Sequence, residues 1–248
     1  MNDSEMDAIL KEATAVRAPV SPELLASIAS SLKPAMRPVK PLAPTWVLAS
    51  GLVTVSLGVA VASGAWSGLA GVASMGWLER VTIFGTLMLL AAVAATELVN
   101  AMIPGSHRRL SSMALVSIAC LGMLALFALE FHDYHTEHFV VSGMACLVAG
   151  VLHAIPAGMF GWLIMRRGFA VNPLAAGAGA GTVAGLSGIT FLELHCTNFE
   201  AFHLLLWHTA VLPVSASLGV AAAAAWAMVP RWWMTLRGKP AMPQKARD

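Results

Sequence analysis

The sequence predicts an all-α integral membrane protein with six transmembrane helices, both termini in the cytoplasm and a short amphipathic cytoplasmic N-terminal arm. Three observations support this prediction. Hydrophobic residues make up 58% of the 248 residues and charged residues only 11%, whereas an average soluble domain carries about 25% charged residues. Six apolar segments recur along the chain, and the Lys and Arg residues lie almost entirely on one side of the zigzag that these segments make.

The six apolar segments are each long enough to be transmembrane helices. They run roughly over residues 45–64, 81–103, 112–130, 139–165, 172–192 and 204–229. At about 1.5 Å per residue, helices of this length cross the hydrocarbon layer of a bilayer, which is about 30 Å thick.

The distribution of basic residues predicts the orientation of these helices. All of the 15 Lys and Arg residues except Arg80 lie before the first segment, after the second, after the fourth or after the sixth. Loops rich in Lys and Arg stay in the cytoplasm, so both ends of the chain are predicted there. The chain then divides into a cytoplasmic arm (residues 1–43), a six-helix membrane block (44–230) and a basic cytoplasmic tail (231–248).

The basic residues form short clusters at the predicted membrane edges. Membrane lipids are therefore their expected neighbours, and the net charge of +2 is not expected to serve direct nucleic-acid binding.

Two short amphipathic helices are predicted within the arm. Ser4 and Asp7 resemble a capping box at the start of the first helix. Ser21 followed by Pro22 places a cap and a first-turn proline at the start of the second. The apolar stripes of the two helices comprise Met6, Ile9, Leu10 and Ala13 in the first, and Leu24, Leu25, Ile28 and Leu32 in the second.

Each apolar stripe needs a surface to cover, because isolated helices this short are only marginally stable in water. Two interpretations stay open. The stripes either lie on the bilayer or the chain's own helix bundle, or they bind a partner and fold on it. A stiff linker with several basic and proline residues, over residues 33–44, joins the arm to the membrane.

The fifth apolar segment is predicted to be central in the bundle. Gly177, Gly181 and Gly185 recur at four-residue spacing among many alanines, and such a stripe of small residues lets another backbone approach closely. Pro156 and Pro213 are expected to disturb the fourth and the last helix, because each proline removes a backbone donor.

Histidine and cysteine residues gather in the outer loops after the third and the fifth segments. His132, His135 and His138 lie in the first of these loops, His195, Cys196 and His203 lie in the second, and His208 lies beside it. Imidazole and thiolate are ligands of zinc and other divalent transition metals, and two facing loops can supply them together. Two other interpretations stay open, because a short extracytoplasmic loop has to be polar and histidine also suits pH sensing.

Polar residues inside the apolar segments suggest two alternative functions. Glu97 and His153 are compatible with a transporter for a metal or small solute, although intramembrane charge is sparse and no inverted repeat is visible. The sequence GLSG at residues 185–188, with His208 on the next helix, resembles the serine and histidine pair of rhomboid intramembrane proteases. The other rhomboid signatures are absent, so an enzyme is not expected.

A stronger resemblance extends over roughly residues 45–230. It rests on Ile103-Pro104-Gly105 with His107-Arg108-Arg109, on Cys146-Leu147 leading through Pro156 to Arg166-Arg167-Gly168, and on Leu194-His195-Cys196 leading to Leu206-Trp207-His208. Together these stretches resemble the NrsF-like family of bacterial membrane anti-sigma factors. The LHC element and the LLWH that follows it are the most specific part of the resemblance.

The resemblance implies a multi-pass protein of the bacterial inner membrane whose N-terminal arm sequesters an extracytoplasmic-function sigma factor. It also implies that a cysteine pair, corresponding to Cys146 and Cys196, takes part in releasing the sigma factor under heavy-metal or thiol stress. We expect these cysteines, with His195 as a third ligand, to contact a transient thiophilic metal ion, and we expect no other cofactor. The outer histidines at 132, 135 and 138 are the weaker sensor candidates, and Cys120 has no counterpart in the family.

Overall fold

The computed structural model describes residues 21–32, 43–103, 106, 109–135, 139–165, 170 and 172–236. The chain separates into two compact units, residues 1–42 and residues 43–248.

The first unit contains α2 (Pro22–Leu32). The Ser21 hydroxyl oxygen accepts a hydrogen bond from the backbone N–H of Leu24 at 3.1 Å, so the predicted cap and first-turn proline of this helix are confirmed. The side chains of Leu24, Leu25 and Ile28 are 54%, 55% and 45% exposed. The other predicted stripe, comprising Met6, Ile9, Leu10 and Ala13, lies outside the described residues.

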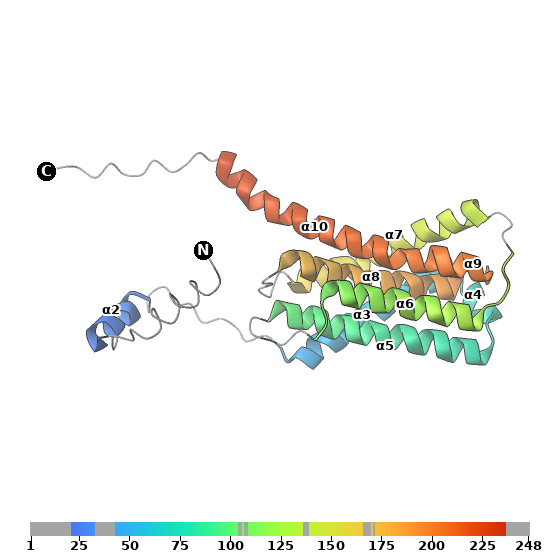
Figure 1. The fold of residues 1–248 in the computed structure, drawn as a ribbon, viewed down its shortest axis with the longest axis horizontal. Coiled ribbons are helices and arrows are strands. Elements are labelled where there is room, and N and C mark those ends of the chain that lie inside the picture. The colour runs from blue at the N-terminus through green and yellow to red at the C-terminus, as the bar shows by residue number, and fades with distance from the viewer. Residues whose placement is uncertain are drawn as a thin grey trace, which may run out of the picture. The chain divides into compact units, whose positions relative to one another are not determined.

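The second unit is a bundle of helices (Figure 1). In chain order they are α3 (Thr45–Ser67), the short α4 (Ala70–Ser74), α5 (Trp77–Met102), α6 (Ser112–Glu130), α7 (Phe139–Met165) and α8 (Pro173–His195), followed by a final run of α9 (Ala201–His203), η1 (Leu204–His208) and α10 (Thr209–Leu236). In the described part of the chain, six helices are long and apolar enough to cross a membrane. The predicted multi-pass membrane protein is therefore confirmed.

Two helices begin earlier than their hydropathy indicates. α5 begins at Trp77 rather than at residue 81, because the Glu79 side chain accepts a hydrogen bond of 2.7 Å from the backbone N–H of Gly76 and so caps a polar first turn. The last helical run begins at Ala201 rather than at residue 204. It includes a π-helical turn, η1, which ends about one turn before Pro213.

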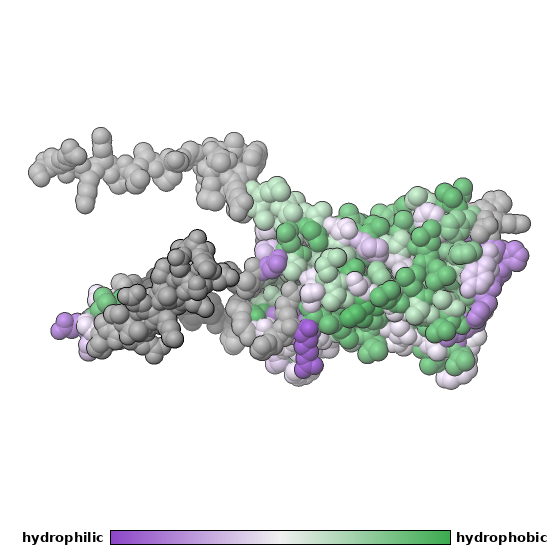
Figure 2. Space-filling model, in the orientation of Figure 1, coloured by the Kyte–Doolittle hydropathy of each residue, from purple (hydrophilic) through white to green (hydrophobic). Residues whose placement is uncertain are grey.

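The surface of the second unit follows the pattern of a membrane protein. Figure 2 shows apolar side chains over the flanks of the bundle and hydrophilic side chains near its ends. Trp46, at the start of α3, and Trp66 and Trp77, at the other end of α3 and at the start of α5, are 73%, 93% and 76% exposed. Exposed tryptophans at helix ends are typical of the two membrane–water interfaces.

α8 is the central helix, as the small-residue stripe predicts. In its most apolar stretch 83% of the residues are buried, against 17–39% in the other five membrane helices, and it contacts α3, α5, α6, α7 and α10 (Figure 1). A Cβ atom added at Gly177 would lie 2.5 Å from the carbonyl oxygen of Gly219, and one added at Gly181 would overlap with the carbonyl of Ser215. Glycine at these positions therefore sets the close approach of α8 and α10.

Candidate functional site

Two cysteines that are 50 residues apart in the sequence meet where α7 and α8 contact each other. Cys146 lies on α7, and Cys196 is the residue that ends α8, where its backbone N–H donates to the carbonyl of Leu192. Their Sγ atoms are 3.6 Å apart. Cys196 is 8% exposed and Cys146 is half-buried. The two thiols are thus close enough to share a ligand.

Two histidines of the final helical run complete this group. The Sγ atom of Cys196 lies 3.8 Å from Nε2 of His203, and the rings of His203 and His208 lie edge to face with centroids 5.2 Å apart. One ligand atom from each of Cys146, Cys196, His203 and His208 lies within 4.8 Å of the others. Within the described residues, this cluster has the residue types and spacing of a metal-binding site; we call it the Cys–His cluster.

The π-turn η1 explains how His203 and His208 come together. In a regular α-helix, residues five apart point about 140° away from each other. The backbone N–H of Thr209 instead donates to the carbonyl of Leu204, which is the i→i+5 bond of a π-helix. This wider turn brings residues five apart close to one face, so both rings are directed at the cysteine pair. Such single π-turns are frequent at functional sites.

Glu193 holds one of these histidines. Its Oε1 atom lies 2.6 Å from Nδ1 of His208, and the two side chains are 0% and 1% exposed. A carboxylate only accepts hydrogen bonds, so an ionised Glu193 holds an imidazole proton on Nδ1, and a neutral ring then carries its lone pair on Nε2. Oε2 of Glu193, Nδ1 of His203 and Nε2 of His208 are all buried without a hydrogen-bond partner.

His195 lies next to Cys196 in the sequence, but the structure places it outside the Cys–His cluster. Its Nδ1 atom is 3.2 Å from the carbonyl oxygen of Gly68, and its ring stacks on that of Phe191 with centroids 5.5 Å apart. Gly68 has a φ of 108°, which favours glycine. The imidazoles beside the two thiols are therefore those of His203 and His208. The ring of His195 instead joins α8 to Gly68, the residue that follows α3.

Two of the predicted sensor histidines, His132 and His135 in the α6–α7 connection, also lie apart from the cluster. His132 and His135 are exposed, and His138 lies outside the described residues. His135 is hydrogen-bonded through Nδ1 to the carboxylate of Asp133, and this hydrogen bond lowers the pKa of Asp133. His132 lines a polar cleft of about 570 Å³ together with Asp133. These residues form a solvated outer surface and are not grouped with the two cysteines.

The loops that carry these residues pack on each other. The rings of Phe131 and Phe199 stack with centroids 5.5 Å apart, and the backbone N–H of Ala201 donates to the carbonyl of Asp133 at 2.5 Å. Beside them α4 covers Cys196 so closely that a Cβ atom at Gly71 would lie 2.5 Å from the Cys196 carbonyl oxygen. The end of the bundle at which α8 terminates therefore encloses the Cys–His cluster.

The thiols of the pair are not equivalent. The hydrogen bond with Cys146 raises the pKa of Cys196, and burial raises it further, whereas the contact with His203 acts in the opposite direction. Burial thus opposes ionisation of Cys196, and the imidazole of His203 beside it favours ionisation.

Comparison with known proteins assigns the chain to a family. Residues 28–232 match the family model NrsF, described as negative regulator of sigma F. The chain belongs to the NrsF family. It is thus a negative regulator of a sigma factor, that is, an anti-sigma factor, as the resemblance in the sequence implies. None of the curated proteins and none of the solved structures with which the chain was compared matches it.

Polar residues that favoured other functions have structural roles in this NrsF-family protein. Glu97 is buried and its Oε2 atom accepts a hydrogen bond of 3.4 Å from the backbone N–H of Leu110. His153 bonds through Nδ1 to the carbonyl of Ala149, one turn earlier in its own helix, and its ring stacks on Phe191 with centroids 3.7 Å apart. Both residues therefore have partners that account for their presence in apolar segments.

The serine and histidine of the rhomboid-like pattern are not paired with each other in the NrsF-family bundle. The Ser187 hydroxyl donates to the carbonyl of Ser56 on α3 at 2.7 Å. Nδ1 of His208 is bonded to Glu193, and its Nε2 atom has no hydrogen-bond partner. A nucleophile requires its base within hydrogen-bond reach, so the contact that would support a protease is missing, and Ser187 instead joins α8 to α3.

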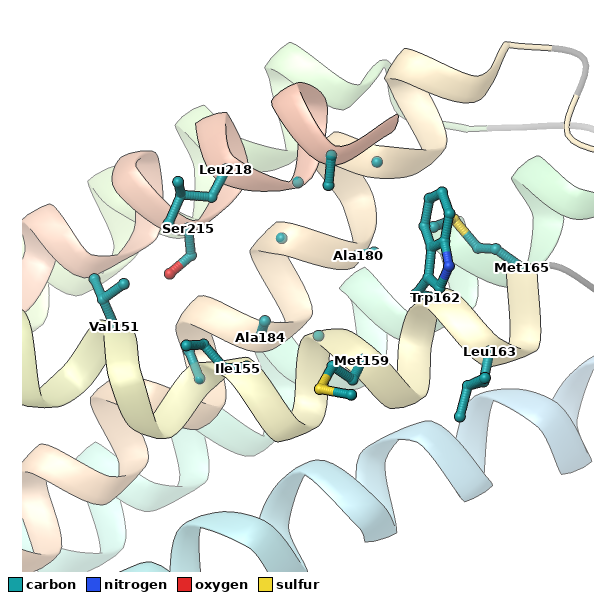
Figure 3. Close-up of a pocket in the computed structure, with 16 residues that line it drawn as sticks. Val151, Ile155, Met159, Trp162, Leu163, Met165, Ala180, Ala184, Ser215 and Leu218 are labelled. Carbon is teal, nitrogen blue, oxygen red and sulfur yellow. The ribbon is translucent and has the colours of Figure 1, made fainter. Parts of the chain in front are cut away.

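An apolar cavity of about 380 Å³ lies between α7, α8 and α10. Figure 3 shows aliphatic, thioether and indole side chains such as Ile155, Met159 and Trp162 around it, with the hydroxyl of Ser215 on its α10 side. Neither Glu97 nor His153 lines this cavity. Its lining carries no charged side chain. The cavity leaves unfilled space beside the central helix.

The sequence places His203 in the same loop as Cys196 and His208 beside it, among the polar residues that could contact a metal. It does not single out these two histidines as partners of the cysteines, because an α-helical periodicity separates the two rings and nothing in the sequence signals a π-turn. Glu193 stands in an apolar run immediately before the LHC element. A carboxylate at that position, within a membrane segment, is the one signal that indicates a buried polar partner.

Proposed function

We propose that this protein sequesters an extracytoplasmic-function sigma factor at the bacterial inner membrane through its N-terminal arm and releases it when an envelope signal acts on Cys146 and Cys196. The observation that carries the proposal is the match to the NrsF family over residues 28–232. The signal in this proposal is heavy-metal or thiol stress, because thiols are the groups in the cluster that such agents modify.

Support for the arm as the binding surface comes from α2. Three of its large apolar side chains, Leu24, Leu25 and Ile28, are each about half exposed to solvent, and they recur on one face of the helix. A helix of 11 residues is too short to be stable alone in water. A groove on a sigma factor would cover this face in the way that amphipathic helices commonly bind partners.

The charge distribution supports a cytoplasmic location for the arm. Basic residues flank the arm side of α3 and continue in the connections after α5 and α7 and in the C-terminal tail. The cysteine pair then faces the opposite, extracytoplasmic side of the membrane. In this arrangement the signal and the sigma factor act at opposite ends of the same bundle, so the helices between them must transmit the change.

Contacts between α8 and α3 are suited to that transmission. Ser187 bonds to the carbonyl of Ser56, and His195 bonds to the carbonyl of Gly68 just beyond α3. α8 also carries Cys196 at its end, and α3 is the first membrane helix after the arm along the chain. A ligand changes the arm only if it binds two packings of the bundle with different affinity. We infer that modification of the cysteine pair shifts α8, and that α3 follows it.

Co-purification of the detergent-solubilised full chain with a co-expressed sigma factor tests this function. The complete chain should retain the sigma factor, and a variant lacking residues 1–40 should not, although its membrane unit remains in the membrane. A transporter would keep its activity after the same deletion. Retention of the sigma factor by the truncated variant would contradict the assignment of the arm.

A further inference from the structure

We propose that Cys146, Cys196, His203 and His208 form a closed four-ligand site for a divalent thiophilic cation such as Zn²⁺ or Cd²⁺, with Glu193 as the residue that positions His208. The biological meaning of this site rests on the proposed function, but the site itself is testable without a sigma factor. The resemblance indicates only the cysteines, whereas the structure supplies the two imidazoles, the carboxylate and the geometry that joins them.

The separations between the ligand atoms fit a tetrahedral ion. Bond lengths of about 2.3 Å to sulfur and about 2.0–2.1 Å to nitrogen place the atoms of a tetrahedral zinc site roughly 3.3–3.8 Å apart. The two Sγ atoms are 3.6 Å apart, and Cys196 Sγ is 3.8 Å from His203 Nε2. The largest separation within the group is no more than 4.8 Å. Small side-chain rotations are therefore enough to close the site.

Unpartnered polar atoms around the thiols point to a ligand. His208 is 0% exposed, and its Nε2 atom has no hydrogen-bond partner although the ring is fully enclosed. Such an atom is costly to bury. With Nδ1 held by Glu193, the lone pair on Nε2 is free to bind a cation. A carboxylate–histidine pair of this kind also occurs behind the metal-binding histidines of known zinc sites.

The chemistry of the donors selects the class of cation. Thiolate sulfur favours soft and borderline ions, imidazole nitrogen accepts them, and hard ions such as Mg²⁺ and Ca²⁺ prefer oxygen. When a divalent cation binds, each thiol loses a proton and two S–metal bonds form. The two positive charges of the cation therefore replace the two positive charges of the released protons. The change is charge-neutral, which suits a site enclosed by apolar helices.

The four ligands come from three separate parts of the bundle. Cys146 lies on α7, Cys196 ends α8, and the histidines lie on the final helical run at the π-turn. Binding therefore ties α7 to α8 and to the final helical run, the last two of which are already joined by the Glu193–His208 contact. It would also draw the end of α8 toward α7 and η1. α8 is the helix that the proposed function requires to move.

The test uses the purified, fully reduced full chain in detergent and Cd²⁺ alone as the probe. The thiolate-to-cadmium charge-transfer absorption in the ultraviolet should reach a plateau at about one Cd²⁺ per chain. His203→Gln and His208→Gln should each lower the affinity for Cd²⁺ at least tenfold, and Glu193→Gln should lower it roughly 10- to 100-fold, the usual effect of removing the partner of a metal-bound histidine. Cys120→Ser and His195→Gln are matched controls and should bind as the parent does.

Several outcomes would overturn the site. Parental Cd²⁺ affinity in both histidine variants would show that the cysteines bind alone, and loss of binding in His195→Gln would indicate a different ligand set. A reduced protein that binds no Cd²⁺ but readily forms a Cys146–Cys196 disulfide with a thiol oxidant would show a redox pair instead.

Size-exclusion profiles and thermal melting of each variant separate loss of a ligand from loss of the fold. His203→Gln leaves the Glu193–His208 contact intact, so it is the variant least expected to disturb the fold.

Co-purification with the sigma factor is scored separately. If the chain binds Cd²⁺ but does not co-purify with the sigma factor, the proposed function is refuted and the site stands; the reverse result refutes the site alone.

Discussion

The region around the Cys–His cluster and the N-terminal arm depart from the usual distribution of residues in opposite ways. Around the cluster, ionisable side chains such as Glu193 and His208 are fully buried. In α2 of the arm, Leu24, Leu25 and Ile28 are exposed. Each arrangement is costly in the isolated chain, because buried polar atoms without partners and exposed apolar faces both raise its free energy. A bound cation would relieve the first cost and a bound protein the second, in agreement with the two proposals.

The largest expected effect is on the arm. Replacing Leu25 and Ile28 together by Asp removes two apolar contacts, each worth about 1.5–3 kcal/mol when fully buried. The affinity for the sigma factor should therefore fall roughly 10²- to 10⁴-fold, and the genes that depend on the sigma factor should be expressed constitutively. Ser30→Asp, on the opposite face of α2, is the matched control and should repress like the parent. Full repression by the double variant would show that this stripe is not the binding surface.

The next largest effect is expected when the cysteine pair is substituted, which should leave binding of the sigma factor by the arm unchanged. Cys146→Ser and Cys196→Ser should each repress normally without metal and should fail to induce when cadmium is added, because one thiolate ligand is lost. A reporter gene under control of the sigma factor measures both states, and Cys120→Ser should respond as the parent does. If the double cysteine variant still induces normally, the outer histidines, beginning with His132, become the preferred sensor.

The sequence predicts much of the bundle because hydropathy and small-residue spacing are local properties. All six membrane helices and the central place of α8 follow from them. The start of α5 at Trp77 does not, since a capping contact from Glu79 extends the helix into a polar turn. In the arm, the cap at Ser21 is equally local and is found as expected.

The cluster depends on tertiary contacts that sequence patterns do not report. Nothing local places Cys146 beside Cys196, because the two residues lie on different helices. His195 is adjacent to Cys196 in the chain, yet neighbouring residues of a helix point about 100° apart, and its ring contacts Gly68 instead. His203 and His208 share a face only because of the π-turn.

A smaller effect is expected where α8 approaches α10. A Cβ atom at Gly181 would overlap with the Ser215 carbonyl, whereas a Cβ atom at Gly85 meets no atom within 4 Å. Gly181→Ala should therefore destabilise the bundle by about 1–3 kcal/mol, the usual cost of overpacking, and Gly85→Ala should not destabilise it. Thermal melting of the purified proteins in detergent measures the difference. Equal melting temperatures for the two variants would contradict the close α8–α10 packing.

The smallest expected effect is on the contact between α8 and α3. Ser187→Ala removes one interhelical hydrogen bond, to the carbonyl of Ser56, and such bonds contribute about 0.6 kcal/mol on average in membranes. The variant should fold and repress normally but should need a different cadmium concentration for half-maximal induction. Thr182→Val is the control, because its hydroxyl bonds only within α8. An unchanged induction curve for Ser187→Ala would remove this bond from the transmission route.

The link between the two ends is tested most directly by adding Cd²⁺ to membranes that hold the complex of the full chain and its sigma factor, and measuring how much sigma factor appears in the soluble fraction. The account predicts that the parent releases the sigma factor and that the double variant Cys146→Ser, Cys196→Ser retains it at the same Cd²⁺ concentration. Equal release from both proteins, or retention by the parent with Cd²⁺ bound, would contradict the account.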